Sequence, residues 1–498
     1  MRPSPQEKPF LTGEDFVLGL RCPKRLYLKK RRPDLGPQLS PLRAGLKAEH
    51  FFLRRLAAEL FPGGQWADEG RPGRSEVAVR TETLVRDPSV PAVFGAVFNY
   101  KGLSPEIDFL ERNRDGSWDL SLLRTGKWLK ATHLWELAFC RHVLDRLDLE
   151  VRHAYLMSVN DQYRRPVDEL RLETLFRQTD CLDRTVELLE LTPRLAGQML
   201  ALLEQEREPV VSLGRHCREP RPCPYERRCD PHRPLHWVGD FYRMSAARKK
   251  KLLKRGIRDI REIPDDQPLT PLQSRIKNAL TAGELFVDQK LSARLLKLPR
   301  PWHYLDFETV SPAVPLYPGT KPYEMVPFQW SLHIEPEVQS LEHRSFLAEG
   351  PEDPRPQFVR SLIRAVSPAG VILTYTNFES SVLRSLKGLF RGQADQLEVL
   401  AGRCVDFCAL IRRHVYHPDF GQSFSLKKVL PALIPDLAYD DLDIQEGETA
   451  GLAFLNLTYA SSPRIKAEIR PALLEYCARD TLALVTLKRF FLGEPRPF

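Results

Sequence analysis

The chain has 498 residues, too many for one ordinary hydrophobic core, so we expect two or three domains. Its 42% hydrophobic and 28% charged residues are typical of a soluble globular protein, and no stretch is long and apolar enough to span a membrane. The formal net charge of +9 suits a polyanionic partner such as nucleic acid, although an ordinary basic protein would have the same charge.

Three blocks follow one another along the chain. Residues 1–235 open and close with basic segments that contain cysteine, residues 236–300 are helical and rich in Lys and Arg, and residues 301–498 begin with a new strand after two prolines. The first eight residues contain no apolar signal region, so we expect a cytoplasmic protein. Nine cysteines in such a chain favour thiols, a metal or a cluster over disulfides.

Four cysteines of the first block form a candidate ligand set. Cys22 stands alone, whereas Cys217, Cys223 and Cys229 share a short segment with prolines, arginines and few apolar residues. Four thiolates suit a [4Fe–4S] cluster or a structural Zn²⁺, and nearby arginines would offset their charge. The other cysteines are expected to be small buried hydrophobes: Cys140, Cys181, Cys404, Cys408 and Cys477.

One upstream cysteine and three near the end of a domain resemble the iron–sulfur nucleases of the RecB type, which include the AddB subunit and the CRISPR adaptation nucleases. The resemblance implies a PD-(D/E)XK fold in which a cluster joins the two ends of the domain. In those nucleases the first gap within the trio is commonly tighter, whereas here both gaps hold five residues.

Strands at 106–111 and 118–124, joined by an Asn/Asp/Gly turn, predict a β-hairpin. The resemblance implies an Asp on the first strand, which Asp108 matches, and Glu-x-Lys on the second, where Leu122 and Arg124 stand instead. Leucine cannot bind a metal and arginine is too basic to replace the lysine. We therefore expect a degenerate nuclease domain that binds nucleic acid.

Two further residues of the first block belong to this candidate site. His50 matches the upstream histidine of the family. Glu136, on the following helix, is an alternative acid that would replace the missing one in a migrated active site. The competing interpretation of His50 and Asp108 is a residual polar pocket without catalytic function.

The middle block contains a basic helix at 246–255 that ends at Gly256, a residue suited to a helix C-terminus. This pattern is similar to a helix–hairpin–helix element that grips backbone phosphates, and a solvated linker helix would look the same. Its candidate nucleic-acid-binding residues are Lys249, Lys250, Lys251 and Lys254.

The last block predicts a mixed α/β domain, because strands come first and helices follow around one sheet. The expected strands are 302–309, 328–334, 341–347 and the buried 370–375. The expected helices are 355–366, one from about Glu379, 405–413, 425–433 and 470–491.

Acidic residues at distant positions of this block are expected to converge. Asp306 and Glu308 are two apart on a strand, so both point to the same side and repel each other unless a cation lies between them. Asp480 lies on the predicted buried face of the last helix, with Leu473, Cys477, Leu484 and Leu487. A buried carboxylate is costly without a cation, and the hydroxyl of Tyr476 can reach the same place.

Two more acids lie between these segments. Glu379 comes at the carboxyl end of the buried strand, where sites commonly form. Asp406 opens a helix, so its charge fits either a metal ligand or a residue that stabilises the helix N-terminus.

The pattern Asp306-x-Glu308, then Glu379, then Tyr476-x-x-x-Asp480 resembles the tyrosine subclass of DnaQ-like (DEDD) exonucleases. The resemblance implies an RNase H-like fold in which four acids hold two Mg²⁺ or Mn²⁺ ions, Tyr476 orients the attacking water, and nucleotides leave from the 3′ end. The third acid is usually Asp in that family and is Glu379 here. Lys427 and Lys428, near a helix start, are candidate phosphate contacts or part of a solvated face.

The order of the three blocks resembles a bacterial family of fusion proteins. This resemblance does not decide among biological roles in DNA repair, mobile-element defence and RNA processing. We expect a 3′-5′ exonuclease acting on single-stranded DNA or RNA ends, with no membrane partner and no protein partner that the sequence identifies. The alternatives are a nucleic-acid-binding adaptor in which both centres have decayed, and a dual nuclease in which both are active.

Overall fold

The computed structural model describes residues 9–37, 41–70, 73–126, 128–337, 340–439, 441–459 and 463–496. The eight N-terminal residues, on which the expectation about a signal region rests, lie outside these ranges. The chain divides into two compact units: unit 1 is Met1–Pro231 with Pro312–Glu324, and unit 2 is His232–Ser311 with Met325–Phe498. The basic middle block therefore lies in unit 2 rather than in a unit of its own.

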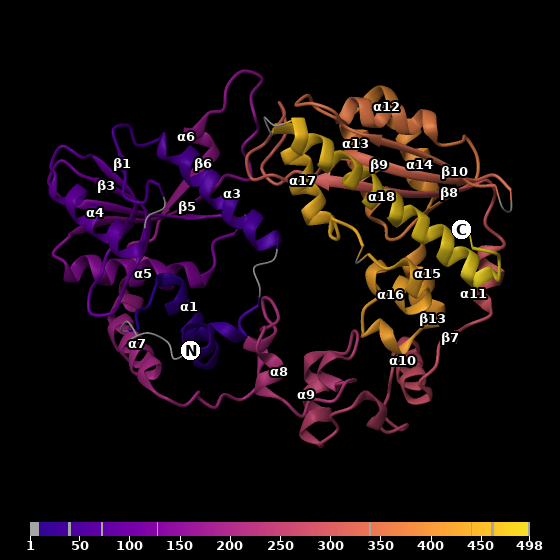
Figure 1. The fold of residues 1–498 in the computed structure, drawn as a ribbon, viewed down its shortest axis with the longest axis horizontal. Helices are drawn as coiled ribbons and strands as arrows, with labels where there is room; N and C mark the ends of the chain where they lie inside the picture. Colours follow the sequence, from indigo (N-terminus) through magenta and orange to yellow (C-terminus); the bar gives the residue numbers. More distant parts are fainter. Residues whose placement is uncertain are drawn as a thin grey trace. The chain divides into compact units, whose positions relative to one another are not determined.

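Unit 1 is built around a six-stranded sheet in the order β1-β2-β3-β4-β5-β6 (Figure 1). The β1–β2 and β4–β5 pairs are parallel and the other pairs are antiparallel. Its strands are β1 (Gln65–Trp66), β2 (Ala92–Val97), β3 (Glu106–Arg112), β4 (Trp118–Arg124), β5 (Val151–Val159) and β6 (Phe176–Asp180). The antiparallel β3–β4 pair confirms the predicted hairpin.

The helices of unit 1 are α1 (Gly13–Arg21), α2 (Pro23–Arg31), α3 (Pro41–Ala58), α4 (Arg74–Arg86), α5 (Ala131–Arg146), α6 (Leu172–Leu175), α7 (Val186–Glu204) and α8 (Glu226–Cys229). One core cluster joins the sheet to α5 and α7, and a second joins it to α3 and to Ala313 and Val314 of the Pro312–Glu324 segment.

Unit 2 contains a five-stranded sheet in the order β10-β9-β8-β11-β12. Strand β9 pairs antiparallel with both β10 and β8, whereas β8, β11 and β12 run parallel. The strands of this unit are β7 (Phe286–Val287), β8 (Trp302–Val310), β9 (Val326–Glu335), β10 (Glu342–Leu347), β11 (Val371–Thr374), β12 (Cys404–Asp406) and β13 (Val415–Tyr416). β7 and β13 form a separate two-stranded pair.

The helices of unit 2 are α9 (Ala246–Lys254), α10 (Pro271–Ala282), α11 (Lys290–Leu295), α12 (Arg355–Ala365), α13 (Phe378–Leu389), α14 (Ala394–Arg403), α15 (Phe407–His414), α16 (Leu426–Leu433), α17 (Gly447–Tyr459) and α18 (Pro463–Leu492). Some of them flank the main sheet, whereas α9 and α10 lie away from it (Figure 1). The helices α12, α13 and α14 share one apolar cluster with the sheet, while α17 and α18 contact β8.

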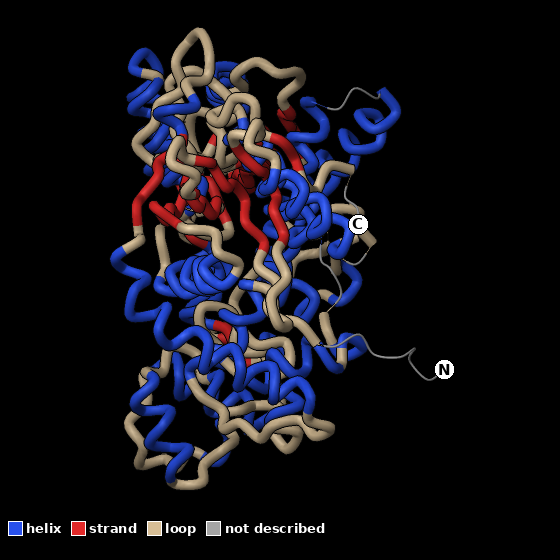
Figure 2. Tube along the Cα trace, turned by 90° about the vertical axis from the view of Figure 1, so that its left-hand side faces the viewer, coloured by secondary structure: helices blue, strands red, loops and turns tan. Residues whose placement is uncertain are grey.

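Both units therefore confirm a mixed α/β protein, in which helix (blue in Figure 2) takes a larger share of the chain than strand (red). The predicted helix 405–413 is wrong at its start, because Val405 and Asp406 belong to β12, which pairs in parallel with β11, and α15 begins only at Phe407. The last helix begins at Pro463 rather than at 470. Within the described residues, no helix combines the length and apolar character needed to cross a bilayer.

Candidate metal centre

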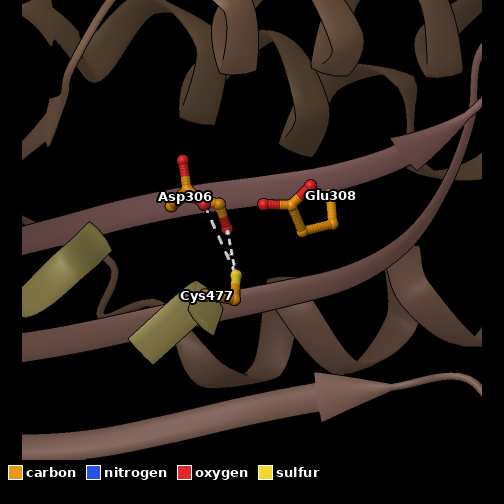
Figure 3. A group of neighbouring side chains, drawn as sticks. All are labelled: Asp306, Glu308 and Cys477. Atoms are coloured by element: carbon orange, nitrogen blue, oxygen red, sulfur yellow. Dashed lines mark hydrogen bonds between the residues drawn. The ribbon is translucent and has the colours of Figure 1, made fainter. Parts of the chain in front are cut away.

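Strand β8 carries two carboxylates on the face that α18 covers. Asp306 pairs with Ser331 and Glu308 with Gln329 across the antiparallel β8–β9 ladder, so both acids point to the same side of the sheet. Figure 3 shows the two side chains on one side of the strand, close to Cys477. Glu308 is buried and Asp306 is half-buried.

Helix α18 brings a third carboxylate to this face. Leu473, Cys477, Leu484 and Leu487 are all buried, which confirms the predicted apolar stripe. Asp480 lies in that stripe with only 9% of its surface exposed. Its charge raises the pKa of Asp306 and Glu308, so the three acids lie within electrostatic reach of one another.

Glu379 supplies the fourth carboxylate from the first turn of α13, directly after β11. The ends of β8, β11 and β12 meet at one edge of the sheet because these strands are parallel. The side chain is buried, and its Oε2 atom has no hydrogen-bond partner. Burial, and then the charges of Asp480 and Asp406, raise the pKa of Glu379 to about 8.

Asp406 ends β12 near Glu379 and caps the following helix. Its Oδ1 accepts a hydrogen bond of 2.7 Å from the backbone N–H of Ala409, which satisfies a free donor in the first turn of α15. The side chain therefore has a structural role, while its charge still acts on Glu379.

The four acids share an unfavourable environment. Burial is the largest cause of the raised pKa of Asp306 and of Glu308, and the neighbouring carboxylates add to it. Burial also raises the pKa of Asp480 to about 6, although hydrogen bonds from Tyr439 and Tyr476 and the charge of Lys427 act in the opposite direction. Such a set of mutually repelling carboxylates is stabilised by protons or by a cation.

Hydrogen-bond donors line one side of this centre. Lys427 Nζ lies 3.1 Å from the hydroxyl of Tyr476, and the hydroxyl of Tyr439 donates to Oδ1 of Asp480. Burial and the nearby carboxylates raise the pKa of Tyr476 above its usual value, so its phenol keeps its proton. Lys428, the next residue, is exposed.

Sequence reasoning missed two of these residues. Tyr439 lies in the irregular segment between α16 and α17, where no periodic pattern marks it. Cys477 was assigned only to the apolar stripe, although its Sγ lies 3.4 Å from Oδ2 of Asp306. Its position in the Tyr-x-x-x-Asp motif, next to Tyr476, was the available signal.

The candidate nuclease centre of unit 1 holds a guanidinium group among its acids. Arg124 Nη2 lies 2.8 Å from Glu136 Oε2, and Arg124 Nη1 lies 3.7 Å from Asp108 Oδ2. Asp108 also accepts a 2.8 Å hydrogen bond from the backbone N–H of Leu123, and His50 Nε2 lies 3.8 Å from its other oxygen. Leu122 is fully buried.

The four predicted cysteine ligands line one pocket of unit 1, together with Lys24 and Arg25. Cys22 lies between α1 and α2, and the backbone N–H of Cys223 donates to the carbonyl of Cys217. Burial raises the pKa of Cys229, and the charge of Lys24 lowers it. Of the remaining cysteines, Cys140, Cys181, Cys408 and Cys477 are buried as expected, whereas Cys404 is half-buried.

The predicted basic helix is α9, and its side chains Lys250, Lys251 and Lys254 are exposed. Ser245 caps its N-terminus, and Gly256 follows its end with a φ of 79°. The chain then makes only a short 3-10 turn at Ile260–Glu262 before α10, so the expected helical restart after Gly256 is limited to that turn.

Residues 303–425 match a family described as "Domain of unknown function (DUF2779)". This stretch contains Asp306, Glu308, Glu379 and Asp406, and it ends before Tyr476 and Asp480. A search of curated proteins found no match. Among solved structures, "Crystal structure of SSO0001" is similar at 14% identity, with a TM-score of 0.24, over 46% of this chain and 89% of that chain.

Proposed function

We propose that unit 2 is a metal-dependent 3′-5′ exonuclease of the DnaQ-like type with an RNase H-like fold, acting on single-stranded DNA or RNA ends. The proposal is carried by one observation: Asp306, Glu308, Glu379 and Asp480 come from β8, α13 and α18, yet lie within electrostatic reach of one another in a largely buried cluster.

The residues present fit two divalent ions. Carboxylate oxygens are the ligands that Mg²⁺ and Mn²⁺ prefer, and the unpaired Oε2 of Glu379 is a donor atom that no protein group satisfies. When bound, the ions would lower the pKa of the attacking water and stabilise charge on the leaving oxygen. The third acid is usually Asp in the DnaQ-like family, so the longer side chain of Glu379 would have to reach the ions from the first turn of α13.

The chain's own donors have separate tasks in this proposal. Tyr476 keeps its proton and presents a hydroxyl beside the acids, so it can orient a water molecule. Lys427 places a positive charge next to Tyr476, where a substrate phosphate would be attracted. Tyr439 holds the Asp480 carboxylate by a hydrogen bond and fixes the orientation of its other oxygen.

Unit 1 is proposed to be a PD-(D/E)XK nuclease fold that binds nucleic acid without cutting it. Arg124 lies between Asp108 and Glu136, so a permanent positive charge already neutralises the acids that would hold a metal. Its four cysteines fit a [4Fe–4S] cluster, because all line one pocket beside Lys24 and Arg25; Zn²⁺ is the alternative occupant. Visible absorbance and iron and sulfide analysis of anaerobically purified protein distinguish the two.

The exonuclease proposal is tested with the full chain and a 5′-labelled single-stranded oligonucleotide in Mn²⁺. Asp306→Asn and Asp480→Asn should each abolish stepwise shortening, while Asp436→Asn, an exposed acid that pairs with Arg496, should not. Binding of the uncut oligonucleotide should persist in all three variants. Undiminished cleavage by Asp306→Asn would contradict the proposal. If a calorimetric titration of the wild type with Mn²⁺ detects no binding, the adaptor alternative is favoured.

A further inference from the structure

A buried thiol lies among the carboxylates of the metal centre. Cys477 is fully buried on α18, and its side chain points toward β8 (Figure 3). Its Sγ lies 3.4 Å from Oδ2 of Asp306, and one donor atom from each of Asp306, Glu308 and Cys477 lies within 4.8 Å of the others. The three side chains are therefore close enough to share one ion.

The sulfur–oxygen distance matches a common metal ligand pair. Zinc–oxygen bonds of about 2.1 Å and zinc–sulfur bonds of about 2.3 Å place the two donors roughly 3.1 to 3.6 Å apart for bond angles between 90° and tetrahedral. The observed 3.4 Å, at which the Cys477 thiol donates a hydrogen bond to Oδ2 of Asp306, lies in that range. The unpaired, buried Oε2 of Glu379 independently indicates that a donor atom of this centre has no partner within the protein.

We infer that Cys477 is a thiolate ligand of this centre and makes it select thiophilic divalent ions, Zn²⁺ and Cd²⁺, over Mg²⁺. The inference rests on the proposed metal centre and deepens it. On binding, the S–H bond breaks, a metal–sulfur bond forms and the proton leaves to solvent. Soft thiolate ligands favour Zn²⁺ and Cd²⁺, whereas Mg²⁺ takes oxygen ligands, so Zn²⁺ is expected to displace Mg²⁺ here.

The test compares the full-length wild type with Cys477→Ser, which keeps the side-chain size but replaces sulfur by a hard oxygen. Cys408→Ser is the matched control, because Cys408 is also a buried thiol of unit 2 and donates to the carbonyl of Phe424. Cd²⁺ and Mg²⁺ are titrated by calorimetry, and the ultraviolet thiolate-to-cadmium absorbance is recorded. The four-cysteine group of unit 1 is common to all three proteins, so it cancels in difference spectra.

Cys477→Ser should bind Cd²⁺ at this centre about 10- to 100-fold more weakly than the wild type, while Mg²⁺ binding is retained. Its thiolate-to-cadmium absorbance should be lower by the contribution of one thiolate. Cys408→Ser should match the wild type. Equal Cd²⁺ isotherms and spectra for Cys477→Ser and the wild type would overturn the inference. If the serine variant does not fold, Cys477→Ala tests the same expectation in its place.

The two proposals fail in different ways. If Asp306→Asn removes Mn²⁺ binding but Cys477→Ser leaves Cd²⁺ binding unchanged, only the role of Cys477 is wrong. If Asp306→Asn changes no isotherm of any metal, the carboxylate centre itself is wrong and the inference falls with it.

Discussion

Arg124 forms an ion pair with Glu136, with 2.8 Å between Nη2 and Oε2, inside unit 1. Both side chains are largely buried, and burial is the main cause that raises the pKa of Glu136 while the Arg124 charge lowers it. The Arg124 guanidinium thus supplies the positive charge that stabilises these carboxylates.

Arg124→Met should therefore destabilise the protein without reducing cleavage. Removing one partner of a buried ion pair leaves Glu136 and Asp108 uncompensated, which we expect to cost about 1–3 kcal/mol of unfolding free energy. Denaturant unfolding measures this cost, and Arg152→Met, which removes an exposed pair with Asp115, should change stability far less. Loss of exonuclease activity in folded Arg124→Met would contradict an inactive unit 1.

Apo-protein stability should fall as pH rises through the range in which the acids of unit 2 ionise. Glu379 has a folded-state pKa of about 8, above its usual value of 4.5, so the native state binds its proton more tightly than the unfolded state does. That stability is fully present below pH 4.5 and is lost as pH approaches 8. Thermal unfolding in EDTA from pH 5 to pH 8.5 measures the slope.

Glu379→Gln should flatten this slope and raise apo stability at pH 8, because an uncharged amide replaces the buried carboxylate. The gain is of order 1 kcal/mol or more, since each pKa unit corresponds to about 1.4 kcal/mol. Mn²⁺ should stabilise the wild type more at pH 8 than at pH 6 and stabilise Glu379→Gln less at both. An unchanged slope in the variant would show that Glu379 does not titrate in this way.

Tyr439→Phe should weaken Mn²⁺ binding, most clearly near pH 6. The Tyr439 hydroxyl stabilises ionised Asp480, so its removal raises a pKa that is already about 6 and leaves less carboxylate available. Calorimetry at pH 6 and pH 8 checks this, with a larger loss expected at pH 6. Tyr416→Phe, another buried tyrosine, loses only a hydrogen bond from Gln422 and should bind Mn²⁺ normally.

Lys427→Met should reduce cleavage by about tenfold or more, as expected when a charge near the reacting phosphate is removed. Lys428→Met is the neighbouring control, because that side chain is exposed while Lys427 contacts Tyr476. Single-turnover rates with the labelled oligonucleotide distinguish the two variants. Equal rates for both would assign Lys427 to a structural role.

Periodic patterns carried most of what could be predicted from the sequence. Three- and four-residue spacing placed Asp480 on the buried face of α18, because burial on one face of a helix leaves a regular trace in the residue types. Strand β12 was read as part of a helix because three residues are too few for a period.

Contacts between distant, irregular segments could not be predicted in the same way. The hydrogen bond from Tyr439 to Asp480 depends on how the loop after α16 folds back on α18, and no local spacing encodes that path. Likewise Arg124 and Glu136 were each singled out in the sequence, but only the structure pairs them. Sequence motifs therefore do not identify side chains whose role depends on tertiary contacts.

Helix α18 supplies Tyr476 and Asp480, and these residues are synthesised long after β8 and α13. A nascent chain on the ribosome would thus carry Asp306, Glu308 and Glu379 before Asp480 is made. The four-acid cluster would therefore be complete only once that late helix docks against β8.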